Sequence, residues 1–171
     1  RRESVGGAVF HERGNTNFTF LSGIKSYSIE KNFRIITDAL SSLGIEAEVS
    51  GRNDITSSGK KISGSAFNIT SDRAFHHGTL LINANLDRLS QYLSPSILKL
   101  KSKGIESARS RVANISEFVI SADHEAVSSA IIKSFFSTYG SGETRVLDTD
   151  NLKTIESLNR YYEKMKSREW L

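Results

Sequence analysis

The sequence predicts an α+β domain in which helices flank a mixed β-sheet. Three observations predict it: strand-length apolar segments fill the first half, one long helical period interrupts them, and helical periods dominate the second half. No apolar run approaches the ~18 residues that a membrane-spanning helix needs. We find no internal repeat and no linker, so residues 1–171 are predicted to form a single domain.

The first half of the chain reads as strands around one helix. Ala8–Phe10 and Asn17–Leu21 have strand length and are separated by turn-forming residues. Apolar side chains then recur at steps of three or four from Ile29 to Leu43, which predicts an amphipathic helix that ends at Gly44.

More strands follow this helix. Ile45–Val49 alternates and predicts a half-buried strand, and residues 55–67 predict a hairpin with Gly59 at a positive φ. His77–Asn83 is a further strand, because its centre is almost continuously apolar.

The second half is predicted to be mainly helical. Leu86–Leu93 and Asp123–Tyr139 have helical spacing, and Asp123 is a good N-cap. Residues 99–111 are basic and contribute little core. Glu143–Leu147 is predicted as a strand, and Asn151–Met165 as a last helix with Leu152, Ile155 and Leu158 facing inward.

Composition narrows the class of protein. The hydrophobic fraction of 37% and the charged fraction of 25% exclude a disordered tail. The net charge of +4 suits anionic small molecules or acidic protein surfaces and is too weak to indicate nucleic acid. The chain has no cysteine, which excludes a disulfide framework, a zinc–thiolate site and a cysteine nucleophile.

The N-terminal residues carry the first candidate site. Arg1 and Arg2 precede Gly6-Gly7-Ala8-Val9-Phe10. Glycines before a strand let backbone N–H groups approach an anion, and arginines add charge-assisted contacts. The segment is not a Walker A loop, because no Gly-Lys-Ser/Thr follows, and it is not a dinucleotide fingerprint, because a strand follows. An ordinary turn with two incidental arginines is the alternative.

A second candidate site combines a loop carboxylate with a lysine. Asp54 follows Gly51-Arg52-Asn53, and a single carboxylate can hold Mg²⁺ together with phosphate oxygens. Lys60 and Lys61 enter a strand of small residues, Ser63-Gly64-Ser65-Ala66, which leaves room for a ligand against the backbone. Because neighbouring strand residues point to opposite faces, we expect Lys61 to share a face with Ser63 and Ser65. The alternative is a plain hairpin with two exposed lysines.

Histidines give a weaker signal. His76 and His77 are adjacent on a predicted strand, so they point to opposite faces and cannot chelate one metal ion together. One of them is expected to face the core or a ligand and the other the solvent. With no cysteine present, a zinc site is not expected.

Five motifs in order resemble those of the lipoate–protein ligases. The resemblance runs from Arg1 to about residue 140 and more faintly to the end of the chain. The motifs are Arg1-Arg2-Glu3-Ser4 with Gly6-Gly7-Ala8-Val9-Phe10-His11, Gly14-Asn15-Thr16-Asn17-Phe18-Thr19-Phe20, Gly51-Arg52-Asn53-Asp54, Lys61-Ile62-Ser63-Gly64-Ser65-Ala66 and His76-His77-Gly78-Thr79-Leu80-Leu81.

The resemblance implies a fold, a reaction and partners. The fold would be that of biotin ligases and class II aminoacyl-tRNA synthetases. Lipoate and ATP, with Mg²⁺, would give lipoyl-AMP, and the lipoyl group would pass to a lysine of an acceptor. The acceptors would be lipoyl domains of 2-oxoacid dehydrogenase complexes and the glycine-cleavage H protein, with no nucleic acid or membrane involved. The compartment would be the bacterial cytoplasm or the mitochondrial matrix.

The resemblance also implies roles for individual residues. Lys61 would be the catalytic lysine and would contact both nucleotide and lipoate, and Asp54 would bind the metal. Further lipoate contacts would come from Ser65, Ala66 and His77. The nucleotide-binding set would be Arg2, Gly6, Gly7, Ala8, Val9, Phe10, Asn53 and Lys61.

Two departures keep alternatives open. Val5 stands where the family has a third glycine, and the chain lacks the sheet segment and the lipoate-pocket loop that precede this motif in the family. The chain is therefore expected to be part of a catalytic domain. A lipoyltransferase that uses only preformed lipoyl-AMP is one alternative, and a silent module that binds lipoyl domains through residues 99–111 is another. An octanoyltransferase is excluded because it needs a cysteine nucleophile.

Overall fold

The computed structural model describes residues 8–93 and 111–168, which divide into two compact units. The large unit lies within residues 8–140 and contains a sheet, and the small unit lies within residues 141–168 and contains two short helices. The single domain expected from the sequence stays a prediction. Val5, Arg2, Gly6 and Gly7 and the basic residues 99–110 lie outside the described residues.

The large unit is built on a five-stranded sheet with the order β1-β5-β4-β3-β2. Each pair of neighbouring strands is antiparallel, and an isolated bridge between Lys61 and Val112 adds a parallel pairing. The α+β fold with a mixed sheet is thereby confirmed. The strands are β1 (Asn15–Gly23), β2 (Glu48–Ser50), β3 (Asp54–Ser57), β4 (Lys60–Ile69) and β5 (Arg73–Leu81).

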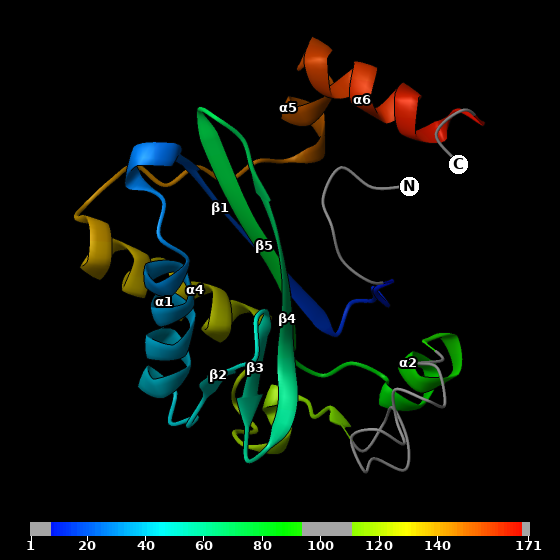
Figure 1. The fold of residues 1–171 in the computed structure, drawn as a ribbon. Helices are drawn as coiled ribbons and strands as arrows, with labels where there is room; N and C mark the ends of the chain where they lie inside the picture. The colour runs from blue at the N-terminus through cyan, green and yellow to red at the C-terminus, as the bar shows by residue number, and fades with distance from the viewer. Residues whose placement is uncertain (1–7, 94–110, 169–171) are drawn as a thin grey trace. The chain divides into compact units, whose positions relative to one another are not determined.

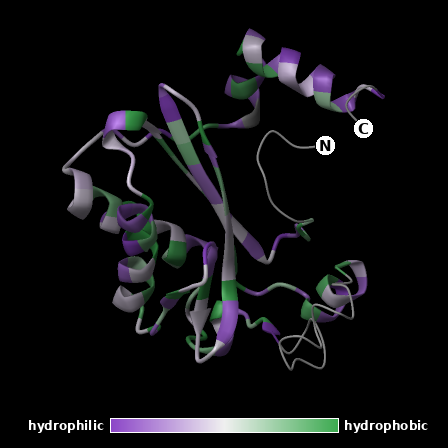
Figure 2. Ribbon diagram, in the orientation of Figure 1, coloured by the Kyte–Doolittle hydropathy of each residue, from purple (hydrophilic) through white to green (hydrophobic). Residues whose placement is uncertain are grey.

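Two long helices, α1 (Ile29–Ser42) and α4 (His124–Tyr139), lie on the same side of the sheet (Figure 1). Each begins at a side-chain cap. Ser28 Oγ accepts the N–H of Lys31 at 3.2 Å, and Asp123 Oδ1 accepts the N–H of Ala126 at 2.8 Å. The apolar stripes of the two helices (green in Figure 2) can therefore pack against one sheet face.

The main core lies between this sheet face and the two helices. It combines side chains from four strands and both helices, and most of them are fully buried. Its largest members with less than 2% exposure are Ile35, Ile36, Leu40, Ile45, Ile55, Ile62, Leu80, Ile115, His76 and Val127.

A second, smaller cluster lies beneath helix α2 (Leu86–Tyr92). Leu81, Ala84, Leu86 and Leu89 are its buried members, and Phe10 packs against them. Asn114 connects the two clusters, because its side chain accepts the N–H and donates to the carbonyl of Ala84 at 2.8 and 2.9 Å. The described part of the large unit also contains two 3₁₀ turns, η1 (Ile24–Ser26) and η3 (Ile115–Glu117).

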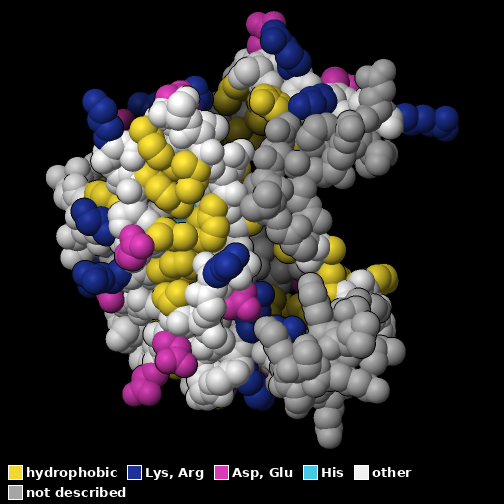
Figure 3. All heavy atoms as spheres, viewed as in Figure 1, with side chains coloured by type: hydrophobic (Ala, Val, Ile, Leu, Met, Phe, Trp, Pro, Cys, Tyr) yellow, Lys and Arg dark blue, Asp and Glu magenta, His cyan; other side chains and the backbone are white. Residues whose placement is uncertain are grey.

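Strand β3 begins at Asp54, opposite Gly64, so the last residues of β4 have no neighbour on that side among the described strands. Phe67 there is partly buried against the core, and Ile69 is 56% exposed. Figure 3 shows hydrophobic side chains (yellow) gathered on the surface between α1 and the sheet, with charged groups around them.

Most elements expected in the large unit are confirmed. The expected strand at Asn17–Leu21 lies within β1, and the expected helices correspond to α1, α2 and α4. Gly44, with φ +82°, follows Leu43, the C-cap of α1. The hairpin turns at Ser58 and Gly59, whose φ angles of +49° and +73° give the two positive values that a type I′ turn requires.

Two expected strands are wrong, because a strand needs a hydrogen-bonded neighbour. Ala8–Phe10 has no strand partner within the described residues, and Asn15 Nδ2 donates to the Phe10 carbonyl at 2.7 Å instead. Glu143–Leu147 has no regular secondary structure and is exposed, and Arg145 pairs there with Glu143 at 2.9 Å.

Three other boundaries differ. The predicted strand at Ile45–Val49 is reduced to β2, which starts at Glu48. Strand β5 starts earlier than expected, at Arg73, and ends at Leu81 because the N–H groups of Ile82 and Asn83 donate to the Gly14 carbonyl at 2.9 and 3.0 Å.

The last predicted helix is two helices, α5 (Thr149–Lys153) and α6 (Glu156–Lys166). Thr154 Oγ1 donates to the Asn151 carbonyl at 2.7 Å, and this side-chain bond competes with helix continuation. Ile155 and Leu158 do not face inward, because they are 42% and 41% exposed. None of the described helices has the length and apolarity that crossing a membrane requires.

Candidate functional site

The sheet of the large unit has two different faces. We call the face under α1 and α4 the covered face. The opposite one, the open face, carries side chains that are mostly half-buried or exposed and often polar. Its members are Asn17 and Thr19 of β1, Phe75, His77 and Thr79 of β5, Lys61, Gly64, Ala66 and Asn68 of β4, and Asp54 and Thr56 of β3.

A β-bulge puts Lys61 on the open face. Thr56 pairs with Lys61 and Ile55 with Ser63, so Ile62 is an extra residue in β4. Ile62 and Ser63 are consecutive and both buried, whereas burial alternates from Ser63 to Ala66. The expectation that Lys61 shares a face with Ser63 and Ser65 is therefore wrong, because the bulge breaks the two-residue period.

Lys61 forms an ion pair with Asp54 on the open face. The Nζ–Oδ1 distance is 2.7 Å, and the two side chains are 33% and 22% exposed. Partial burial reduces the screening of the attraction by solvent but also removes water from both charges, so the net contribution of the pair to stability is expected to stay near the ~0–1 kcal/mol of a surface pair. The pair brings together two residues that the sequence pointed to separately.

Hydrogen bonds to the backbone hold the segments of this pair in place. The N–H of Ser65 donates to the Asn53 carbonyl at 2.7 Å, and Asn53 Nδ2 donates to the Ser65 carbonyl at 3.1 Å. These bonds hold the 51–54 loop against β4. On the other side, the Ala113 N–H donates to the Lys61 carbonyl at 3.0 Å.

Small residues line the open face beside the ion pair. Gly64 is opposite Thr79 and Ala66 is opposite His77 in the pairing of β4 with β5. His77, half-buried, therefore points to the same side as Lys61 and Ala66. Ser65 points to the covered face, where its Oγ is buried with no hydrogen-bond partner among the described residues.

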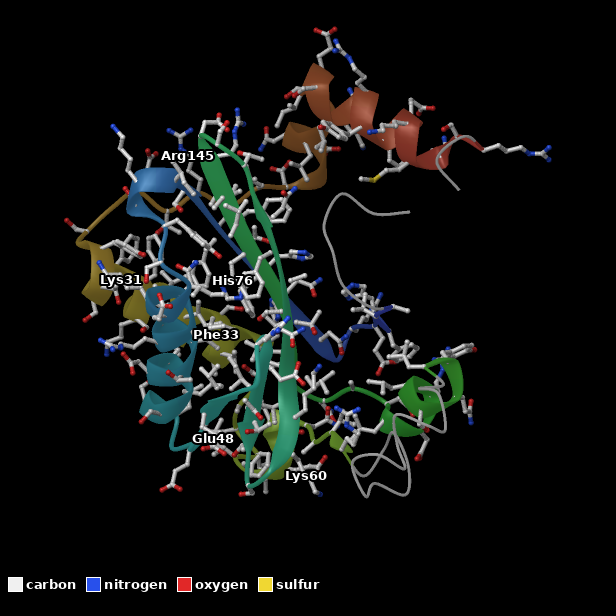
Figure 4. The ribbon with its side chains drawn as sticks, in the orientation of Figure 1. Lys31, Phe33, Glu48, Lys60, His76 and Arg145 are labelled. Carbon is white, nitrogen blue, oxygen red and sulfur yellow. The ribbon has the colours of Figure 1, made fainter. Side chains whose placement is uncertain are left out.

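His76 is the histidine that faces the core, as expected for one of the pair. Its ring lies 4.5 to 5.8 Å, centroid to centroid, from those of Phe18, Phe20, Phe33 and Phe67. Figure 4 labels His76 and Phe33. Burial, with a smaller effect of His77, lowers the pKa of His76 from 6.5 to about 4, so this ring is neutral at pH 7.

Lys60, which is not in the predicted site, is exposed at the tip of the hairpin (Figure 4). Three described residues of the predicted nucleotide-binding set precede β1. Ala8 and Val9 are exposed, and Phe10 stacks on Tyr92 of α2 with ring centroids 5.7 Å apart. Arg88 lies over the Phe10 ring at 5.9 Å. The nucleotide-binding roles assigned to Ala8, Val9 and Phe10 stay predictions.

Sequence reasoning missed three features of the site. The bulge at Ile62 leaves no signal in residue type. The pairing of Lys61 with Asp54 depends on strand register, and only the opposite charges of the two segments hinted at it. The contacts of Arg88 and Tyr92 with Phe10 are long-range. No group of three or more potential metal ligands occurs in the described part of the chain.

The comparisons with known proteins agree on one family. The family model of the lipoyl protein ligase A/B catalytic domain matches residues 1–136. The lipoate-protein ligase A of Psychrobacter cryohalolentis is 53% identical over 99% of this chain, which covers 52% of that protein. The chain thus spans about half the length of the curated relatives it matches.

Solved structures resemble the chain along 99% of its length. A P. falciparum protein in complex with lipoate has a TM-score of 0.80 at 35% identity, with 49% of that chain covered. The bipartite lipoate protein ligase of an archaeal lipoylation system, from Thermoplasma acidophilum, has 0.79 at 28%, with 68% covered. A lipoate-protein ligase A bound with ATP has 0.74 at 28%, with 70% covered. The chain therefore belongs to the family of the lipoyl protein ligase A/B catalytic domain.

Proposed function

We propose that the chain carries the nucleotide- and lipoate-activating part of an ATP-dependent lipoate–protein ligase. Lipoate and ATP would form lipoyl-AMP and pyrophosphate, and a lysine amine of an acceptor domain would then displace AMP. The observation that carries the proposal is the lysine–aspartate pair at 2.7 Å on an open sheet face lined by small residues.

The first step needs fixed positive charge. A lipoate carboxylate must approach the α-phosphate of ATP, and two anions repel unless a cation lies between them. Lys61 is the lysine of the open face within the described residues. Its ammonium is a compact point charge, which can contact a carboxylate oxygen and a phosphate oxygen together. In the second step the same ammonium would stabilise the developing oxyanion.

Asp54 fits a role in binding Mg²⁺. Magnesium is held by one or two carboxylates with substrate phosphates and keeps several waters. Asp54 offers one carboxylate beside Lys61, so the described residues alone do not form a closed metal site. When bound with ATP, Mg²⁺ would neutralise phosphate charge. Asp54 would then hold the ion, and its pairing with Lys61 would loosen.

The open face would hold the lipoate chain. Gly64 and Ala66 have little or no side chain, which leaves space above the backbone of β4. The rings of Phe75 and His77, 5.4 Å apart, border this space. An apolar acyl chain can lie on such a surface with its carboxylate toward Lys61. The relatives bound with lipoate or ATP, and the relative described with its E2 lipoyl domain, support these ligands and a lipoyl-domain partner as proposals.

Pyrophosphate exchange tests this function. The full-length protein that contains this sequence is incubated with ATP, Mg²⁺, labelled pyrophosphate and lipoate, and label should enter ATP only when lipoate is present. Lipoylation of an E2 lipoyl domain is measured in parallel, with free lipoate plus ATP or with synthetic lipoyl-AMP.

The two measurements separate the three functions considered. Exchange together with lipoylation from free lipoate supports the ligase. Lipoylation from lipoyl-AMP without exchange would replace the ligase by a transferase. Binding of the lipoyl domain without either reaction would leave a silent binding module and end the enzymatic proposal.

A further inference from the structure

We propose that Gly64 is a positioning residue for Lys61: the missing side chain of Gly64 provides the space in which the Lys61 ammonium lies beside Asp54. The proposal deepens the proposed function and rests on it for its rate measurement. Its structural measurement is independent of any activity.

Distances at Gly64 carry the argument. A Cβ at this position would lie 2.9 Å from Lys61 Nζ and 3.0 Å from Lys61 Cε. Real Cβ atoms essentially never approach a heavy atom within 3.0 Å, so Nζ would have to move. Asp54 Oδ1 would be 3.9 Å away, in ordinary contact. The lysine side chain therefore occupies the place that an alanine methyl group would take.

The backbone does not explain the glycine at this position. Gly64 is not among the described glycines with positive φ, and it continues the β4 ladder opposite Asp54 and Thr79. An alanine is therefore compatible with the backbone, and its one severe contact is with the flexible end of a lysine. Such a contact is relieved by moving the lysine, at small cost to the fold and at direct cost to the ammonium position.

The bulge makes this arrangement possible. Because Ile62 is the extra residue, Lys61 lies three positions before Gly64 and still points to the same face. The long lysine side chain then runs along its own strand over the glycine and reaches Asp54 on β3. Without the bulge, Gly64 and Lys61 would point to opposite faces.

Gly78 supplies a matched control with the opposite expectation. A Cβ there would lie 2.5 Å from Phe18 Cζ and 2.9 Å from the Gly64 carbonyl oxygen, so the clash is with a buried ring and with backbone. At Gly23 a Cβ would meet nothing closer than the Asp72 carbonyl oxygen at 3.9 Å. Gly64, Gly78 and Gly23 thus test a movable clash, a rigid clash and no clash.

The experiment compares G64A, G78A and G23A in the full-length protein that contains this sequence. G64A should keep the wild-type melting temperature within about 2 °C, while pyrophosphate exchange falls at least tenfold. In a crystal structure of G64A, Lys61 Nζ should lie beyond ion-pair distance from Asp54. G78A should lose stability, and G23A should match wild type in both properties.

Other results of these measurements would contradict the proposed role of Gly64. An ion pair retained in crystals of G64A, or exchange at the wild-type rate, overturns the proposal. If G64A is instead destabilised, the double variant G64A/K61A should recover the stability of K61A, because the clashing atoms are gone; no recovery overturns it. If the wild type shows no exchange, the proposed function fails, and the crystal structure of G64A still decides the role of Gly64.

Discussion

The covered and open faces of the sheet use the same strands for different purposes. On β5, His76 is fully buried among four phenylalanine rings, while the next residue, His77, lies half-buried on the open face. On β4, Ile62 enters the core, and Lys61 before it pairs with Asp54. A strand thus packs the core with one face and carries the proposed site on the other, and substitutions on the two faces should have separable effects.

The two faces also differ in whether their polar atoms have interaction partners. On the open face the charged groups of Lys61 and Asp54 are paired. On the covered face the hydroxyls of Ser63 and Ser65 and both ring nitrogens of His76 have no hydrogen-bond partner within the described residues. An unpartnered buried polar atom costs free energy, so the covered face is less stable than its apolar packing alone would give.

The largest expected effect is on the open face, at Lys61. Removing a fixed charge from a developing negative charge lowers the rate by about 10²–10³, or roughly 3–4 kcal/mol. Lys61→Met should therefore nearly abolish pyrophosphate exchange in the full-length protein. The melting temperature should change little, because the Lys61 side chain is a third exposed and contributes only one ion pair.

Two further variants define which property of Lys61 matters. Lys61→Arg should also fail, because the wider planar head does not fit where a compact ammonium does. Lys60→Met is the control, and it should change the rate less than about threefold because Lys60 is exposed at the hairpin tip. If Lys60→Met is inactive and Lys61→Met is active, the assignment of the catalytic role to Lys61 is wrong.

Under helix α1, a substitution should lower stability and leave the exchange rate unchanged. Leu40 is fully buried in the main core, so Leu40→Ala should lower the free energy of unfolding by about 3 kcal/mol through lost burial and a cavity. Denaturant unfolding measures this loss. Below the new melting temperature the exchange rate per folded molecule should stay within about twofold of wild type. A large rate loss in the folded variant would show that the two faces are coupled.

Acid should also act on the covered face. Burial first, and His77 second, lowers the pKa of His76 to about 4 from its ordinary 6.5, so the unfolded chain binds a proton there more readily than the folded one. This contribution to stability is complete above pH 6.5 and is lost as the pH falls toward 4. The loss would reach about 3 kcal/mol, at 1.36 kcal/mol per pKa unit.

His76→Leu isolates that effect. The variant should lose less stability than wild type between pH 6.5 and pH 4, as measured by denaturant unfolding at each pH. His11→Ala, at an exposed histidine, should keep the wild-type pH dependence. An unchanged pH dependence in His76→Leu would show that another group causes the acid loss.

Local sequence patterns predicted the helices of the large unit well, whereas the strands depended on pairing between distant segments. Helix α1 follows from the spacing of Phe33, Ile36 and Leu40, which are all buried. The hairpin turn follows from Gly59. Ala8–Phe10 has the composition of a strand and finds no partner strand in the described residues, and composition cannot report the presence of a partner.

The candidate site shows the same limit. The residue types of Lys61, Asp54 and Gly64 were visible in the sequence, and their small and charged character indicated a ligand surface. Which of them share a face depended on the bulge at Ile62. A bulge arises from the fit between neighbouring strands, so a two-residue period in one strand cannot reveal it.

The smallest expected effect separates the two faces most directly, because it concerns neighbouring residues. Ser65 was expected to contact lipoate, yet its hydroxyl is buried on the covered face and unpartnered in the described structure. Ser65→Ala removes only that hydroxyl, so stability should stay within about 1 kcal/mol of wild type or rise slightly, since replacing an unsatisfied buried polar group by an apolar one is near neutral. The KM for lipoate should change less than about twofold.

Ala66→Leu is the matched variant on the open face. Its larger side chain would occupy the surface beside Lys61 and His77, and the KM for lipoate should rise at least fivefold. Steady-state exchange at varied lipoate concentration compares the two. A strong KM increase in Ser65→Ala together with none in Ala66→Leu would mean that lipoate binds from the covered face. The open face would then not be the substrate surface.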